Sequence, residues 1–352
     1  MKRIVLVIII CAFVFSCNEK PKYQPRNVSK VEIKILLEDS LLNVRAIEID
    51  KDGIGFATSN GEIGGETYSF LNDGNIVAKS IQLKHDSIIP NFRSLAFTNK
   101  GGYLLSISFL ALLYKVSKDS IKLVYKETHP KAFYDSMDFW NDQEGIAIGD
   151  PTDDCMSIII TRDGGNTWDK LSCDDLPKAK KGEAAFAASD TNIAIVGEHT
   201  WVATGGIASR VLYSADKGKT WDVFETPIVQ GKETTGMYSI DFYNEKIGFA
   251  VGGDYTQPDN NTANKIRTTN GGKTWELVAE NKNPGYRSCV QFVPNGKGKE
   301  LVALGFKGID YSNDFGVSWK HLSDEGFYTI RFLNDSIAYA AGNGRISKLI
   351  FK

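Results

Sequence analysis

Pairs of short apolar segments recur along this chain at a nearly constant spacing. In each pair, a segment that alternates apolar and polar residues precedes a segment rich in Ala, Gly and Ile. Alternation with a period of two residues indicates a half-buried β-strand, and small residues suit strands that crowd together near an axis. Seven such pairs begin at residues 43, 91, 135, 183, 238, 287 and 328, so the spacing runs from 41 to 55 residues. The segments are 43–49 with 53–57, 91–97 with 102–106, 135–140 with 145–149, 183–187 with 192–197, 238–242 with 247–252, 287–292 with 300–305, and 328–332 with 336–340.

Each repeat unit has room for about four strands of some five to seven residues, which is the size of one blade of a β-propeller. We therefore predict an all-β protein, a seven-bladed β-propeller of four-stranded antiparallel blades. Only one strand, at about 345–351, follows the last pair, and one alternating segment, 30–36, precedes the first. We expect these two strands to pair and close the ring, because closure removes an exposed sheet edge.

A second pattern, [Ser/Thr]-x-[Asp/Asn]-x-Gly-x-[Thr/Ser]-Trp, occurs at 161–168, 214–221, 268–275 and 312–319. It predicts a tight turn between two strands, because Asp accepts hydrogen bonds from the backbone of its own turn and Gly takes positive φ readily. The Trp then begins the outgoing strand and packs between sheets. This octapeptide resembles the Asp box, or BNR repeat, of sialidase-like and sortilin-like β-propellers. We interpret it as a folding device and not as a ligand site.

Further segments resemble a family of exported bacterial propellers that is similar to photosystem II assembly factors. They are 131–135, 149–151, 182–189, 204–206, 252–255 and 285–288. The resemblance covers roughly residues 40–345 and implies a seven-bladed propeller. It also implies binding of membrane-protein subunits during assembly, without catalysis. The sequence shows no photosynthetic context, so the partner of those factors does not transfer to this chain.

The first residues have the pattern of an export signal. Met1-Lys2-Arg3 is basic, and residues 4–15 form an apolar run of twelve, which is too short for the roughly 20 residues of a membrane-spanning helix. Val14-Phe15-Ser16-Cys17 resembles a bacterial lipobox. We expect a lipoprotein signal peptide at 1–16, a tether at 17–29 and the propeller at 30–352, with lipidated Cys17 attaching the protein to a membrane of the bacterial cell envelope. The alternative is an ordinary secretory signal.

Composition excludes several classes of function. The chain has 352 residues and a formal net charge of −2, so we expect no binding of nucleic acid. No nucleotide or haem motif occurs and the four histidines are scattered, so we expect no cofactor and no metal. Asp254 and residues 259–261 could hold calcium, although a solvated loop is the simpler interpretation. We expect a monomer.

Two cysteines flank the first Asp box. Cys155 precedes the strand that enters the turn, and Cys173 ends the strand that leaves it. Folding this hairpin brings the two together in an oxidising compartment, so we predict a disulfide between Cys155 and Cys173.

In four-stranded blades, the loops that enter the first strands share one face with the loops that join second to third strands. Polar residues there converge on one mouth. The candidate binding residues are Arg45, Arg93, Asp135, Asp150, Glu183, Arg210, Asp254, Tyr255, Tyr286 and Arg287. Of these, we expect Arg45, Arg93, Glu183, Asp254 and Arg287 to line the mouth. Clustered arginines suit a carboxylate or sulfate ligand; alternatively, they pair with Glu183, Asp135 and Asp150 as a buried lining.

We predict a lipid-anchored, non-catalytic scaffold or assembly factor that binds a cell-envelope protein or a glycan at this mouth. The alternative is a sialidase-like glycoside hydrolase or lyase. Sialidases resemble this chain in their Asp boxes and use a Tyr–Glu pair, which Tyr286 or Tyr255 could form with Glu183. Phe92-Arg93-Ser94-Leu95 matches the sialidase arginine motif only in part, because it lacks Pro.

Overall fold

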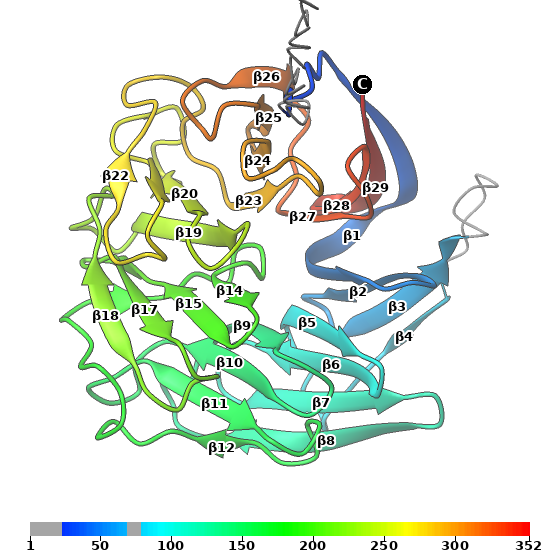
Figure 1. The fold of residues 1–352 in the computed structure, drawn as a ribbon. Coiled ribbons are helices and arrows are strands. Elements are labelled where there is room, and N and C mark those ends of the chain that lie inside the picture. Colours follow the sequence, from blue (N-terminus) through cyan, green and yellow to red (C-terminus); the bar gives the residue numbers. More distant parts are fainter. Residues whose placement is uncertain (1–22, 69–78) are drawn as a thin grey trace, which may run out of the picture.

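The protein is a ring of antiparallel β-sheets (Figure 1). The structure, a computed structural model, describes residues 23–68 and 79–352. Within these ranges all regular elements are strands. The part of the chain so described contains no helix long and apolar enough to cross a membrane. The predicted signal peptide, Cys17 and the first residues of the predicted tether lie outside the described residues.

Four of the sheets contain four strands each. They are β5–β8 (Phe92–Thr98, Gly101–Ser106, Ala111–Ser117, Ser120–Glu127), β9–β12 (Tyr134–Phe139, Gly145–Gly149, Ser157–Thr161, Asp169–Lys170), β14, β15, β17 and β18 (Ile193–Val196, His199–Ala203, Arg210–Ser214, Asp222–Glu225), and β23–β26 (Cys289–Phe292, Leu301–Gly305, Gly308–Ser312, Lys320–Ser323). A six-stranded sheet joins β19–β22 (Thr235–Phe242, Gly248–Asp254, Lys265–Thr268, Glu276–Leu277) to β13 (Glu183–Ala184) and β16 (Gly205–Gly206).

The last and first predicted repeat units share a single seven-stranded sheet built around one long strand, β1 (Val31–Ile49). The N-terminal half of β1 pairs with β29 (Asn343–Phe351), from Val31 opposite Phe351 to Glu38 opposite Arg345. Its C-terminal half pairs with β2 (Gly53–Thr58), from Val44 opposite Thr58 onward. The other strands of this sheet are β27 (Thr329–Phe332), β28 (Ile337–Ala341), β3 (Glu62–Thr67) and β4 (Lys79–Gln82). The first and last strands of the chain are thus hydrogen-bonded neighbours.

The fourth repeat unit differs from the prediction by one segment. We expected first and second strands at 183–187 and 192–197, whereas the innermost strand is β14 and the second is β15. The reason is a tight hairpin in which Val196 pairs with His199 and Gly197 takes a φ of 62°. Of the predicted first strand, only Glu183 and Ala184 are in a strand, and they pair with β16. The residues between β13 and β14 are therefore free to enter the centre of the ring.

The octapeptides predicted to be Asp boxes each contact a neighbouring sheet. In the first box, the Asp163 carboxylate accepts hydrogen bonds from the backbone N–H groups of Asn166 and Thr167. The Tyr103 hydroxyl, from the preceding sheet, donates to the Gly164 carbonyl at 2.8 Å. Gly165 has a φ of 71°, and a Cβ on it would lie 2.2 Å from the Tyr103 ring, so only glycine fits there. Trp201 makes the same kind of bond to Gly271 of the third box, at 2.9 Å.

The sulfur atoms of Cys155 and Cys173 are 1.97 Å apart, so a disulfide closes the hairpin of the first Asp box. Cys289 is a free, buried thiol.

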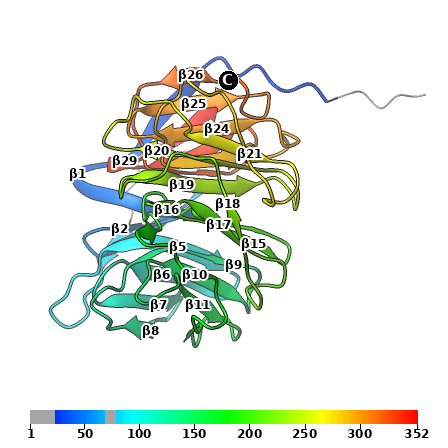
Figure 2. The same ribbon diagram turned by 90° about the vertical axis from the view of Figure 1, so that its left-hand side faces the viewer.

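Two faces of the ring must be distinguished. The Asp-box face carries the turns between third and fourth strands, and the entry face carries the loops that lead into the first strands. Residues 23–29, the described part of the predicted tether, lie against the Asp-box face and not free of the ring. The Arg26 guanidinium binds the Glu300 carboxylate at 2.8 Å, the Asn313 side chain donates to the Arg26 carbonyl at 3.0 Å, and Val28 is buried in the core. Figure 2 shows this segment leaving the ring on the side opposite the bend of β1.

Candidate binding site at the centre of the ring

Residues 187–191, called the plug segment below, cross the centre of the ring between β13 and β14. Their polar groups bond to residues of all six other repeat units. The bonds are Arg45 Nη1 to Ala188 O (3.0 Å), Arg93 Nη1 to Ala187 O (3.0 Å), Leu95 N to Asp190 Oδ2 (2.9 Å), Met137 N to Asp190 Oδ1 (3.4 Å), Ile240 N to Thr191 O (2.9 Å), Ser189 Oγ to Ser288 O (2.6 Å) and Thr329 Oγ1 to Ser189 O (2.8 Å). The plug segment therefore closes the axis and forms a floor.

A cavity of about 500 Å³ lies on the entry face above this floor. Every repeat unit contributes to it, mostly from loops that precede first strands or follow second strands. Its lining consists of Arg45, Arg93, Phe133, Asp150, residues 184–188, Glu233, Tyr238, Tyr255, Tyr286, Ser288, Phe306 and Tyr328. Five predicted binding residues meet here: Arg45, Arg93, Asp150, Tyr255 and Tyr286.

Arg45 and Arg93 are half-buried cations without a carboxylate partner. Each donates one hydrogen bond to a plug carbonyl, and the Arg45 guanidinium lies 3.8 Å from the centre of the Tyr328 ring. No carboxylate oxygen among the described residues comes within 4.0 Å of either guanidinium, and Arg45 Nε has no partner there. Burial lowers the pKa of Arg45, and burial together with the charge of Arg45 lowers the pKa of Arg93 to about 10. The pair therefore favours an incoming anion.

Aromatic rings form one wall of the cavity. Phe186 stacks on Tyr238 at a centroid distance of 3.9 Å, and Tyr238 meets Tyr286 edge to face at 4.8 Å. Phe306 packs against Tyr286 at 5.4 Å. Burial raises the pKa of Tyr286 above its ordinary range, so its hydroxyl is protonated at neutral pH. This wall can bury an apolar group next to the two arginines.

Two acidic side chains, Asp150 and Asp135, lie near the arginines but form no ion pair with them. The Asp150 carboxylate accepts a hydrogen bond from the Ala185 N–H at 2.8 Å, and burial raises its pKa to about 6. Asp135 is fully buried, and burial and then the charge of Asp150 raise its pKa well above the ordinary value. Burial therefore disfavours the charged form of Asp135, which weakens its compensation of the positive charge of Arg93.

Glu183 and Arg210 form a buried ion pair away from the cavity lining. Arg210 Nη2 lies 2.6 Å from Glu183 Oε2, and Thr204 donates to Glu183 Oε1 at 2.7 Å. Glu183 was expected in the mouth, but its carboxylate is satisfied inside the ring wall because β13 pairs with β16 beside Arg210. Without Glu183 in the cavity, the Tyr–Glu pair of the glycosidase alternative does not assemble.

Arg287 and Asp254 also differ from the expectation that they line the mouth. Arg287 Nη2 lies 2.6 Å from Asp310 Oδ2 of β25, and both side chains are buried. Asp254 accepts hydrogen bonds from the backbone and hydroxyl of Thr256, at 2.9 and 2.6 Å. Both charged groups are used to fix loops, so neither is available to a ligand in this arrangement.

Sequence reasoning singled out Tyr255 and Tyr286 but missed the other aromatic residues of the site. Phe186, Tyr238 and Tyr328 were assigned to strands or strand starts, and Phe133, Phe306 and Glu233 were not singled out. A signal existed for Tyr238 and Tyr328, because each stands at the start of a first strand, as Arg45 and Arg93 do. Phe186 had no such signal, since its segment was mistaken for a strand.

The opposite end of the axis is acidic. A cavity of about 150 Å³ lies between the plug segment and the Asp-box face, lined by Glu48, Asp138, Asp190, Asp241 and Arg331 among others. Arg331 binds Glu48 at 3.1 Å and lies 3.9 Å from an Asp190 oxygen. Burial raises the pKa of Asp138 to about 7 and that of Asp241 to about 6. No group of three or more His, Cys, Asp or Glu side chains suited to a metal ion occurs in residues 23–68 and 79–352.

Comparison with known proteins supports the fold. No family model and no curated protein matches the chain. Solved structures do match over nearly their full length. A YCF48 structure with bound D1 peptide shares 12% identity at a TM-score of 0.65, covering 93% of this chain and 99% of that one. YCF48 from Cyanidioschyzon merolae shares 10% identity at a TM-score of 0.65, covering 92% and 99%. The WD40 repeats of RRP9 share 13% identity at a TM-score of 0.61, covering 94% and 99%. The chain therefore has a β-propeller fold.

Proposed function

We propose that this protein is a non-catalytic scaffold that binds a carboxylate-bearing segment of a partner protein in the cavity on its entry face. The observation that carries the proposal is the pair Arg45 and Arg93. Two half-buried guanidinium groups without a carboxylate partner among the described residues lose hydration and gain little in return. An incoming carboxylate would compensate both, and planar guanidinium groups match its geometry.

The aromatic wall argues for a polypeptide segment and against a small anion. Phe186, Tyr238 and Tyr286 offer apolar surface beside the arginines, so the ligand would carry an apolar or aromatic side chain next to its carboxylate. YCF48, similar in fold, has been seen with a bound D1 peptide. That likeness is one of architecture, so the partner of this chain is not carried over from it.

The remaining parts of the proposal concern assembly and location. We infer seven blades closed by the chain ends, which is supported by the pairing of β1 with both β29 and β2. The four octapeptides act as Asp boxes, and their hydrogen bonds support this. We propose attachment to the bacterial cell envelope through lipidated Cys17, on the strength of the N-terminal sequence alone. The partner would then be an envelope protein, and a glycan is the less favoured ligand.

A charge-removal comparison tests the binding proposal. The full-length protein, its Arg45→Ala/Arg93→Ala variant and an Arg162→Ala control are used to capture proteins from detergent-solubilised envelope, and recovered partners are titrated as peptides with free or amidated carboxylates. Arg162 lies on the Asp-box face, where it binds Glu144. We expect the double variant alone to lose at least tenfold in affinity. Equal binding by all three proteins would overturn the proposal.

A further inference from the structure

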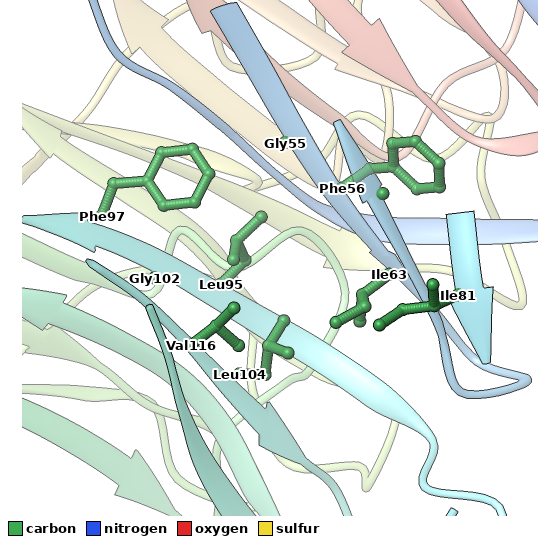
Figure 3. Close-up of a pocket in the computed structure, with 10 residues that line it drawn as sticks. Gly55, Phe56, Ile63, Ile81, Leu95, Phe97, Gly102, Leu104 and Val116 are labelled. Carbon is green, nitrogen blue, oxygen red and sulfur yellow. The ribbon is translucent and has the colours of Figure 1, made fainter. Parts of the chain in front are cut away.

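A third cavity lies between the first and second repeat units. It measures about 330 Å³ and is bounded by β2–β4 on one side and β5–β7 on the other. Figure 3 shows Leu95, Leu104 and Val116 of one sheet facing Ile63 and Ile81 of the other. Its lining residues, all within the described part of the chain, include no charged side chain.

Two other junctions between sheets are filled by three aromatic rings at the corresponding place. Between β5–β8 and β9–β12, Tyr103 packs on Phe139 at a centroid distance of 4.4 Å, and Phe139 meets the Asp-box Trp168 at 5.7 Å. Between the sheets of β15 and β19, the set is Trp201, Phe242 and Trp275, at 3.7 and 5.9 Å. Each set takes one ring from a second strand, one from the next first strand and one from an Asp box.

Two of these three rings are missing at the cavity. The second-strand rings of the two filled junctions are Tyr103, which pairs with Ala96, and Trp201, which pairs with Ala194. At the cavity, the residue in the same register of β2 is Gly55, which pairs with Glu48. The Asp-box Trp is missing too, because β7 and β8 are joined by a short turn in which Ser117 pairs with Ser120. The cavity therefore stands where an indole and a second aromatic ring stand elsewhere in this protein.

The third ring, Phe97, remains and leans over the glycine. A Cβ on Gly55 would lie 2.4 Å from Phe97 Cζ, and one on Gly102 would lie 3.2 Å from Phe97 Cε1. Any larger residue at position 55 would push the Phe97 ring out of this place. The cavity thus keeps the ring of Phe97, and its other large lining residues are Phe56 and aliphatic side chains.

We propose that this cavity is a ligand site for a flat, uncharged small molecule of one or two aromatic rings. Apolar cavities of about 150 Å³ take up benzene and exclude water, and this one is roughly twice that size. The lining offers no ionic partner, so a charged ligand would lose its hydration without compensation. The site is independent of the cavity on the entry face.

Indole serves as the probe, with binding to the full-length protein measured by calorimetric titration. We expect one saturable site. Leu104→Trp places a ring in the cavity and should weaken indole binding at least tenfold; Val116→Phe does the same from β7, in case the first variant folds poorly. Indole-3-acetate and N-acetyltryptophanamide should bind at least tenfold more weakly than indole, because of charge and of the attached backbone respectively.

Trp275→Ala provides a matched control, because it opens a hole at a junction that is normally filled. This variant should bind two indoles where the parent binds one. The proposal is overturned if the variant binds indole and the parent does not, or if both filled variants bind as the parent does. Tighter binding of N-acetyltryptophanamide than of indole would overturn the assignment to a small molecule, since the site would then accept a polypeptide side chain.

Discussion

Asp190 accepts a hydrogen bond from the backbone N–H of Leu95, with 2.9 Å between the nitrogen and Oδ2. Its other oxygen lies 3.4 Å from the Met137 nitrogen, so one carboxylate of the plug segment holds two inner strands. This carboxylate therefore links the plug segment to β5 and β9, the first strands of two neighbouring sheets.

Replacing Asp190 with Ala should destabilise the fold strongly. The change leaves two buried N–H groups unpaired and removes a carboxylate near Arg331, which together cost about 2–5 kcal/mol in free energy of unfolding. Urea denaturation measures the loss, and Asp174→Ala, an exposed position, serves as the control. A loss in Asp190→Ala no larger than in the control would mean that the plug segment is not fastened through this carboxylate.

The acidic end of the axis should make stability depend on pH. In the folded state the pKa of Asp138 is about 7, raised first by burial and then by the charges of Glu48 and Asp241, against the opposing charge of Arg331. An unfolded Asp has a pKa of about 3.9. A carboxyl whose folded pKa is raised stabilises the fold below its unfolded pKa, and this contribution is lost as pH rises through the folded pKa.

Asp138→Asn should therefore flatten the decline in unfolding free energy between about pH 4 and pH 7. Urea midpoints at several pH values report it, with Asp222→Asn, an exposed residue of β18, as the control. If the Asp138→Asn curve runs parallel to that of the parent, Asp138 does not titrate in this range.

The disulfide joins Cys155 and Cys173, which are 18 residues apart in the sequence. A loop of this size contributes about 3 kcal/mol by limiting the freedom of the unfolded chain. The Cys155→Ser/Cys173→Ser variant should lose roughly that much free energy of unfolding. Reductant should lower the free energy of unfolding of the parent protein to that of the variant, and it should not change that of the variant. A parent protein whose stability does not respond to reductant would contradict the prediction.

Deleting residues 344–352 should destabilise the whole ring and not only its last repeat unit. The deletion removes the strand that pairs with both β1 and β28, and so exposes two sheet edges. We expect a large fall in Tm and a less cooperative transition in calorimetry. A chain that begins at residue 23 serves as the control, with the parental Tm. An unchanged Tm on deleting 344–352 would show that the ring does not depend on this pairing.

The β-architecture could be predicted from sequence because its signals are local. The Asp boxes set turns within eight residues, and the apolar alternation of β5 or β19 needs no knowledge of neighbours. The fourth unit was mispredicted because residues 183–187 are mostly small and apolar, like a strand, whereas the plug segment that follows bonds to six other units. No short-range pattern carries that information.

The candidate site was predicted only in part, for a similar reason. Arg45, Arg93 and Arg287 all stand near the start of a first strand. What separates them is Asp310 of β25, which lies 23 residues further on and binds Arg287. Whether an arginine is paired or free depends on such a partner, and spacing does not reveal it. Tyr286 of the aromatic wall was predicted, but Phe186 was not, because its segment leaves the predicted strand just before the plug segment.

The course of β1 places the two ends of this strand segment on different faces of the ring. Residues 23–29, which lead into β1 at Val31, lie against Asn313 on the Asp-box face, whereas Arg45 and Arg93 line the cavity on the entry face. Any attachment made through the residues before Tyr23 would therefore lie on the side of the Asp-box face. A partner could then bind in the cavity on the entry face without contacting the attachment. One chain could be attached and have a partner bound at the same time.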